Sequence, residues 1–162
     1  MKLPEHVDQL RTRIENTFDK EFARLGLGER KQLEIEKLPE EIRPKRLRFE
    51  EILQSHIGEV GGYEEAREKL IEELTFTLFN RLASVKVMEA AAFFPPVLTK
   101  QTEHGDRSFG HKAWLEANPD MRSEELEGIR KYIIHTFDEL GTTLPLFSRD
   151  YPSALLPDTI SL

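Results

Sequence analysis

One amide and three charged side chains interrupt the most apolar stretch of the chain, residues 74–92: Asn80, Arg81, Lys86 and Glu89. The residues around them keep helical spacing and are nearly all apolar, as in a helix that protein surrounds. A buried polar group without a partner costs roughly 2–7 kcal/mol, so these four side chains must form a network or a site. Asn80, Arg81 and Lys86 are therefore candidate contacts for phosphate or acidic groups. The alternative is that Arg81 and Glu89 satisfy one another inside the core.

A second candidate for phosphate binding is the densest basic stretch, which places Arg43, Lys45, Arg46 and Arg48 within six residues. Cations at this spacing can neutralise the phosphates of a nucleic-acid backbone. The alternative is the solvated start of a helix, because surface charge needs no function. Acidic residues flank the cluster and can balance it: Glu40, Glu41, Glu50 and Glu51.

The distribution of charge limits where such binding could occur. The 162 residues carry a net charge of −7, which argues against a protein that coats nucleic acid. Residues 1–48 hold 12 basic and 10 acidic side chains, whereas residues 49–162 hold 11 and 20. Contact with DNA is therefore expected to be local.

The sequence offers little catalytic equipment. It has no cysteine, which excludes thiol nucleophiles, disulfides and cysteine-ligated metals. It contains neither of the glycine-rich phosphate-binding fingerprints. His104 and His111, with Glu103 and Asp106, form its one candidate metal cluster, but their spacing matches no established metal site. We therefore predict no catalytic residue and no metal ligand; a small metal-dependent hydrolase would require these four residues to converge.

The polar positions of the apolar stretch also belong to a longer pattern, Phe-Asn-Arg-Leu-Ala-x-x-Lys-x-Met-Glu at residues 79–89. This pattern resembles the helical region ahead of the catalytic domain in large adenine-specific DNA methyltransferases. The likeness is to the PglX type of the BREX phage-defence systems and to related type IIG restriction–modification enzymes. A second element, Leu-Phe at 146–147 followed by Pro152 and Leu-Leu-Pro at 155–157, is similar to one that follows in that family.

The resemblance, which spans roughly residues 70–160, implies a non-catalytic N-terminal helical domain. The S-adenosylmethionine pocket and the Asn-Pro-Pro-Tyr catalytic motif of the family lie further downstream. Asn118-Pro119-Asp120-Met121 shares two letters with that motif and lacks the aromatic residue that stacks on the flipped adenine. S-adenosylmethionine is thus expected in a downstream domain. The partners implied for this chain are DNA, that catalytic domain or other defence-system subunits.

The elements that must position these residues are helical. Apolar residues at steps of three and four predict helices over residues 4–25, 45–57, 63–92 and 123–140, the last with Ser123 as its N-cap. One helical turn is expected around residues 112–117, and a short extended piece between residues 31 and 38. The proline-rich residues 144–162 are expected to lie across the bundle. The fold predicted is all-α: an irregular bundle of about five helices around the central helix, in one domain of residues 1–162.

The function expected is a non-catalytic helical domain of a DNA adenine methyltransferase in a phage-defence or restriction–modification system. It would be the front of a longer enzyme or a separate chain that supports it. The alternative is a stand-alone helical adaptor that binds or regulates another protein. No apolar run approaches the roughly 20 residues that span a bilayer, and the first residues are charged. A cytoplasmic protein without membrane contact is therefore expected.

Overall fold

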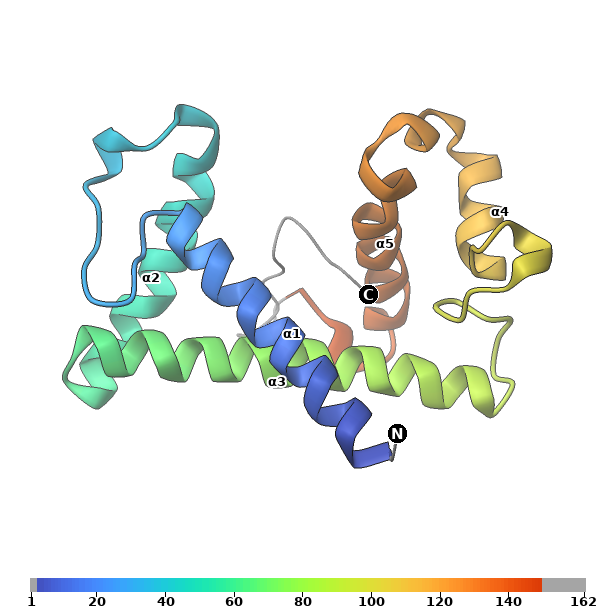
Figure 1. Cartoon of the computed structure of the whole chain (residues 1–162), viewed down its shortest axis with the longest axis horizontal. Coiled ribbons are helices and arrows are strands. Elements are labelled where there is room, and N and C mark those ends of the chain that lie inside the picture. Colours follow the sequence, from blue (N-terminus) through green and yellow to red (C-terminus); the bar gives the residue numbers. More distant parts are fainter. Residues whose placement is uncertain (1–2, 150–162) are drawn as a thin grey trace. The chain divides into compact units, whose positions relative to one another are not determined.

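The computed structural model describes residues 3–149, and these residues form helices joined by loops, with no β-strand among them (Figure 1). The α-helices are α1 (Leu3–Arg24), α2 (Arg43–Val60), α3 (Tyr63–Ala90), α4 (Phe109–Ala117) and α5 (Ile129–Gly141). The predicted all-α class is confirmed. The expected path of residues 150–162 across the bundle lies outside the described residues.

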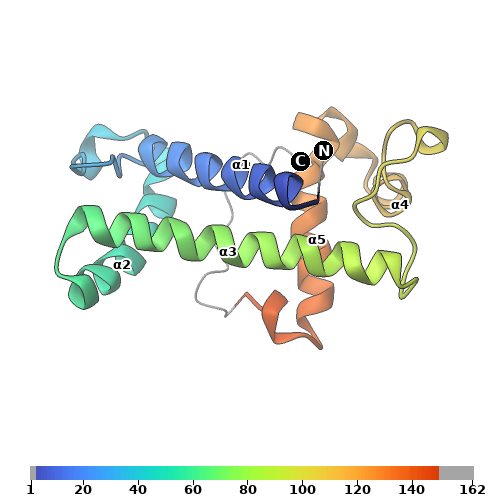
Figure 2. The same cartoon turned by 60° about the horizontal axis from the view of Figure 1, so that its bottom comes forward.

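The described residues divide into two compact units, one up to Phe76 and the other from Thr77. The long helix α3 is unbroken, and its first half belongs to the first unit and its second half to the other (Figure 2). The prediction of one domain over residues 1–162 stays a prediction.

The first unit has the core that the apolar spacing of α1 predicts. A stripe of side chains, Ile14, Phe18, Phe22 and Leu25, is buried, as are apolar residues of α2 and of the first half of α3. Phe22 and Phe49 meet edge to face with ring centroids 5.2 Å apart. The buried positions of α2 are Arg46, Phe49 and Leu53. An arginine therefore occupies a core position of this helix.

The loop from α1 to α2 differs from the prediction. Residues 31–38, expected to be partly extended, contain the 3-10 turn Ile35–Lys37, and Leu27 and Gln32 form an isolated bridge. Backbone groups in such a loop need partners that a strand would have supplied. Arginine and tyrosine side chains supply some of them: the Nε of Arg67 donates to the Leu27 carbonyl at 2.9 Å and the Tyr63 hydroxyl to the Gly28 carbonyl at 2.6 Å.

A histidine joins α2 to α3 in this unit. His56 Nδ1 lies 3.0 Å from the Ile52 carbonyl oxygen and Nε2 lies 2.7 Å from a carboxylate oxygen of Glu73. Both ring nitrogens face acceptors, and only the doubly protonated ring can donate to both. Burial lowers the pKa of His56, but the hydrogen bonds to Glu73 and Ile52 and the nearby charge of Glu59 outweigh it, so the pKa is raised.

We expect this histidine to make stability depend on pH. A raised pKa in the folded state means that the contribution is complete below the ordinary value of 6.5 and is lost as the pH rises through the folded value. The free energy of unfolding of the wild type should therefore exceed that of His56→Gln by more at about pH 5.5 than at about pH 8.5. Urea unfolding at both pH values measures this, and an equal difference at both would contradict it.

The second unit is built on the second half of α3. Its buried side chains come from α3, from the short helix α4, from α5 and from the 3-10 turn Pro145–Phe147: Leu78, Leu82, Val85, Leu115, Ile133, Phe137 and Phe147. The prediction that α3 is enclosed on all sides here is wrong in part, because the Val87 side chain is 67% exposed. The apolar residues of α3 extend around more of the helix than the neighbouring elements cover.

The last helix begins later than predicted. α5 starts at Ile129, and Ser123 ends the 3-10 turn Pro119–Ser123, donating its hydroxyl to the Asp120 carbonyl at 2.9 Å. Between them, Leu126, Glu127 and Gly128 have left-handed backbones with φ of 49°, 54° and 68°. Non-glycine residues adopt this conformation at a cost, so contacts must hold it. The fourth helix is longer than the single turn expected, beginning at Phe109.

Candidate functional site

The basic cluster of residues 43–48 lies at the start of α2, in the first unit. Arg46 is 2% exposed, and its two terminal nitrogens donate to the carbonyls of Leu25 at 2.9 Å and Leu33 at 2.7 Å. Its Nε donates to Glu50 at 3.2 Å. Arg46 therefore connects α2 to the start and the middle of the loop that follows α1, which explains why a cation occupies a core position.

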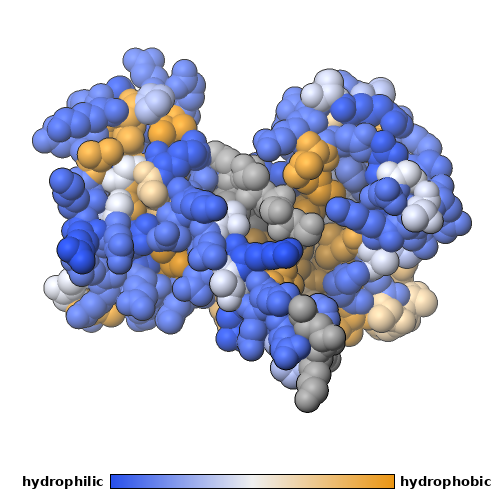
Figure 3. Space-filling view, in the orientation of Figure 1, coloured by the Kyte–Doolittle hydropathy of each residue, from blue (hydrophilic) through white to orange (hydrophobic). Residues whose placement is uncertain are grey.

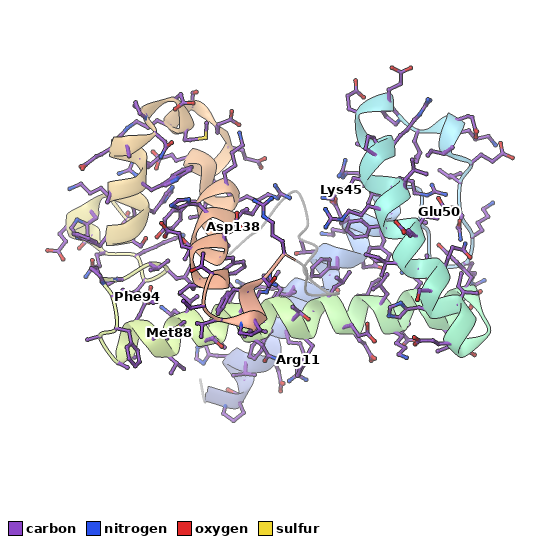
Figure 4. All side chains as sticks on the ribbon, turned by 180° about the vertical axis from the view of Figure 1, so that it is seen from behind. Arg11, Lys45, Glu50, Met88, Phe94 and Asp138 are labelled. Carbon is purple, nitrogen blue, oxygen red and sulfur yellow. The ribbon has the colours of Figure 1, made fainter. Side chains whose placement is uncertain are left out.

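Two more members of this cluster also bind within the protein. Lys45 forms an ion pair of 2.7 Å with Glu21, and Figure 4 labels Lys45 and Glu50 on α2. Arg43 donates to the carbonyls of Leu38 and Glu36 at 3.0 and 3.2 Å. Among residues 3–149, Arg48 is the member of the cluster that is exposed and makes no described contact with another side chain. The cluster thus functions mainly as a scaffold for the preceding loop.

Arg81 of α3 is also buried, at 3% exposure. It donates through Nε to the Leu146 carbonyl at 2.7 Å and through Nη2 to the Ser148 carbonyl at 3.0 Å. Its guanidinium lies over the Phe137 ring, 5.4 Å from the centroid. Arg81 therefore ties residues 146–148 to α3 and α5.

Glu89 satisfies a different segment. It accepts hydrogen bonds from the backbone N–H groups of Val97, Leu98 and Thr99 and from the Thr99 hydroxyl. Burial raises the pKa of Glu89, but these four donors outweigh burial and hold the pKa below its ordinary value. Lys86 lies 3.7 Å from Glu89 and donates to the Thr99 hydroxyl. The predicted network is real here, and it closes the loop after α3.

Asn80 is half-buried and faces a groove instead of the core. The groove has a volume of about 580 Å³, and α3 and residues 144–147 line it. Ala83 and Val87 of α3 and Leu144 and Pro145 of the facing segment supply apolar walls. We call this the α3 groove. On the side of the groove that α3 forms, the small side chain of Ala83 lies between Asn80 and Val87 on one face of the helix.

The histidines that could have bound a metal have other roles. His111 Nε2 lies 3.0 Å from the Glu127 carbonyl oxygen, and the His104 ring packs edge-on against Phe109 at 5.7 Å. Within residues 3–149, no group of three or more His, Asp or Glu residues converges on a point where a metal ion could bind. The carboxylate of Glu127 instead binds Arg107 with both oxygens, which holds the left-handed turn at residues 126–128.

One site was not apparent from the sequence. A pocket of about 590 Å³ lies between the loop after α3, α4 and α5, and its walls include four aromatic side chains, a histidine and a glutamate: Phe94, Phe109, Trp114, Tyr132, His135 and Glu139. We call it the aromatic pocket. Figure 3 shows apolar surface reaching the exterior of the second unit, and Figure 4 labels Phe94 beside Met88.

Packing around Tyr132 shapes this pocket. The Tyr132 ring stacks on His111 with centroids 5.1 Å apart and meets Trp114 at 5.6 Å, and its hydroxyl donates to the Val97 carbonyl at 3.1 Å. A Cβ at Gly110 would lie 2.2 Å from that hydroxyl oxygen, so the position of the Tyr132 hydroxyl requires glycine there. In the sequence, Gly110 lies two residues before the helical turn predicted around residues 112–117 and four before the only tryptophan, which was the available signal.

The described side chains thus form structural networks and line pockets at the surface. No helix among residues 3–149 is long and apolar enough to cross a membrane. No protein-family model, no curated protein and no solved structure matches this chain.

Proposed function

We propose that this chain is a non-catalytic helical module that binds a protein partner through the α3 groove. The observation that carries the proposal is the exposure of apolar side chains there: Val87 is 67% exposed and Leu144 is 38% exposed. Exposed apolar residues that line a groove are typical of a contact surface.

The partner proposed is the catalytic domain of a PglX-type adenine-specific DNA methyltransferase of a phage-defence or restriction–modification system. Support comes from the resemblance at residues 79–89, because Asn80 and Ala83 of that string line the groove. Residues 3–149 form no strand followed by a glycine-rich turn, the arrangement expected to hold S-adenosylmethionine. The proposal therefore assigns that cofactor to the partner domain.

Contact with DNA is expected to contribute little to this function. Arg43, Lys45, Arg46 and Arg81 use their charges within the protein, which leaves Arg48 and Lys86 as exposed cations among the seven candidates. Two cations on a protein of net charge −7 provide little phosphate neutralisation. Binding of duplex DNA by this chain alone should therefore be weak at any salt concentration.

We expect Val87→Asp to weaken binding to the isolated catalytic domain of a PglX-type methyltransferase by about tenfold or more. A carboxylate in an apolar contact surface must lose its hydration without gaining a partner, and 1.4 kcal/mol corresponds to a factor of about ten. Biolayer interferometry with the immobilised catalytic domain measures the dissociation constant.

Leu47→Asp is the matched control, since Leu47 is an exposed leucine on α2, in the first unit, and should bind like the wild type. Equal loss in both variants would assign the effect to charge and contradict the proposal. If the wild type binds the catalytic domain and Val87→Asp binds it equally tightly, the groove is not the contact surface. A wild type that binds no methyltransferase would favour the stand-alone adaptor.

A further inference from the structure

The aromatic pocket has walls that attract positive charge. The faces of Trp, Tyr and Phe rings carry negative electrostatic potential, and Trp is the strongest of the three in binding cations. Trp114, packed against the buried Tyr132, forms one corner of the pocket, and Phe94 and Phe109 belong to the loop and helix around it. Of the described residues that line it, none is lysine or arginine, and Glu139 supplies a carboxylate.

The corner is held in place before any ligand arrives. His111 stacks on the face of Tyr132, and the Tyr132 hydroxyl is bonded to the Val97 carbonyl. Trp114 contacts both rings, with its centroid 6.2 Å from that of His111. Rings fixed in this way lose little conformational entropy on binding, which favours affinity.

Two carboxylates near the pocket, those of Glu89 and Glu139, add negative charge that also favours a cation. Burial raises the pKa of Tyr132, and the carboxylates of Glu89 and Glu139 raise it further, against the hydrogen bonds to Ser108 and Thr136. The carboxylates thus disfavour a negative charge at the phenol. Glu139 is exposed, and its carboxylate lies 3.3 Å from His135 Nε2 at the solvent side. An exposed pair of this kind is weak, so Glu139 remains able to attract a cation.

The lining of the pocket is mostly apolar, and Asn118, Thr136 and Glu139 are among its few polar members. Apolar walls favour a cation that needs few hydrogen-bond acceptors. A primary ammonium has three N–H groups that each need an acceptor when it leaves water. A quaternary ammonium has none, and its methyl groups fit apolar walls.

We propose that the aromatic pocket binds a methylated ammonium group. Its volume of about 590 Å³ exceeds such a head group and lies in the range of pockets that hold whole small ligands. The ammonium can belong to a small molecule such as choline or to a methylated lysine side chain. The inference rests on the pocket alone and does not depend on the proposed function.

Trp114 is the only tryptophan of the chain, so its fluorescence reports on the pocket directly. The full chain is titrated with tetramethylammonium, choline and a peptide with trimethyllysine. The comparison ligands are the same peptide with unmodified lysine and 3,3-dimethylbutan-1-ol, the uncharged analogue of choline. We expect a saturable change with at least one methylated ammonium ligand. The matching comparison ligand should bind about fivefold more weakly or worse.

The pattern of ligands identifies the source. Choline binding without binding of the trimethyllysine peptide indicates a small molecule, and the reverse indicates a modified protein. No saturable response to any methylated ammonium would overturn the proposal. An equal response to 3,3-dimethylbutan-1-ol would overturn it as well, because it would show an apolar pocket without preference for charge.

Two variants test the two sources of attraction. Glu139→Gln should weaken binding of the methylated ammonium about fivefold, whereas Glu103→Gln, an exposed glutamate of the same unit outside the pocket lining, should not. Phe109→Leu keeps an apolar side chain and removes a ring. It should therefore weaken binding of the methylated ammonium and leave binding of the uncharged analogue unchanged. Phe109 is 44% exposed, and circular dichroism checks that the fold is intact. Unchanged affinity in both pocket variants would refute the proposal.

Discussion

Arg46→Ala is expected to lower the free energy of unfolding by about 3 kcal/mol. The change removes a buried guanidinium and with it the donors to the Leu25 and Leu33 carbonyls, at the start and in the middle of the loop after α1. Gly26 packs against the same side chain, since a Cβ there would lie 2.8 Å from its Nη1. Truncation therefore leaves a cavity as well as carbonyls without this donor. Urea unfolding followed by circular dichroism measures the loss.

The neighbouring Arg48→Ala is the control for Arg46→Ala. Arg48 is exposed, so its replacement should change stability by no more than about 0.5 kcal/mol. Arg46→Lys should recover only part of the loss, because a single ammonium cannot reach two carbonyls in the geometry of the guanidinium fork. If Arg46→Ala and Arg48→Ala proved equally stable, the assignment of Arg46 as a structural residue would be wrong.

Arg81→Ala is expected to cost about 3 kcal/mol as well, with a local signature in the second unit. Two hydrogen bonds to residues 146–148 and the contact with the Phe137 ring disappear together. Amide hydrogens of residues 144–149 should then exchange faster, because their segment loses its attachment to α3. Hydrogen–deuterium exchange with mass spectrometry measures this, and Tm gives the global effect.

Lys86→Ala provides the comparison for Arg81→Ala on the same helix. Lys86 is 52% exposed and touches Thr99 and Glu89, so its loss should cost less than about 1 kcal/mol and leave exchange at residues 144–149 unchanged. Faster exchange at residues 144–149 in Lys86→Ala, or unchanged exchange there in Arg81→Ala, would show that another contact holds this segment.

The helices of this protein were predictable because burial imposes a period on the sequence. The stripe from Ile14 to Leu25 and the stretch from Leu70 to Val85 place apolar residues every three or four positions, and both are buried helical faces. The start of α5 was not predictable in this way. Leu126 lies in step with the apolar residues of α5, yet it occupies a left-handed turn that a contact with Arg107, distant in sequence, stabilises through Glu127.

The roles of the basic residues could not be obtained from the sequence. An arginine that binds phosphate and one that binds carbonyl groups have the same local sequence, and only the path of the surrounding chain distinguishes them. The sequence correctly identified the residues around Arg81 and Glu89 as a polar network inside an apolar helix. The sequence left two interpretations open, contacts with phosphate or acidic groups and a pair between Arg81 and Glu89. The structure instead pairs Arg81 with residues 146–148 and Glu89 with residues 97–99.

The chain's composition and periodicity determined an all-α protein with an acidic balance, without cysteine chemistry and with a mostly apolar second half of α3. These properties follow from local rules, because helix formation and burial depend on neighbours three and four residues away. Which cations remain exposed and where a pocket opens were decided by tertiary structure. Trp114 and Tyr132 are 18 positions apart and meet where α4 packs beside α5, with Gly110 leaving room for the Tyr132 hydroxyl.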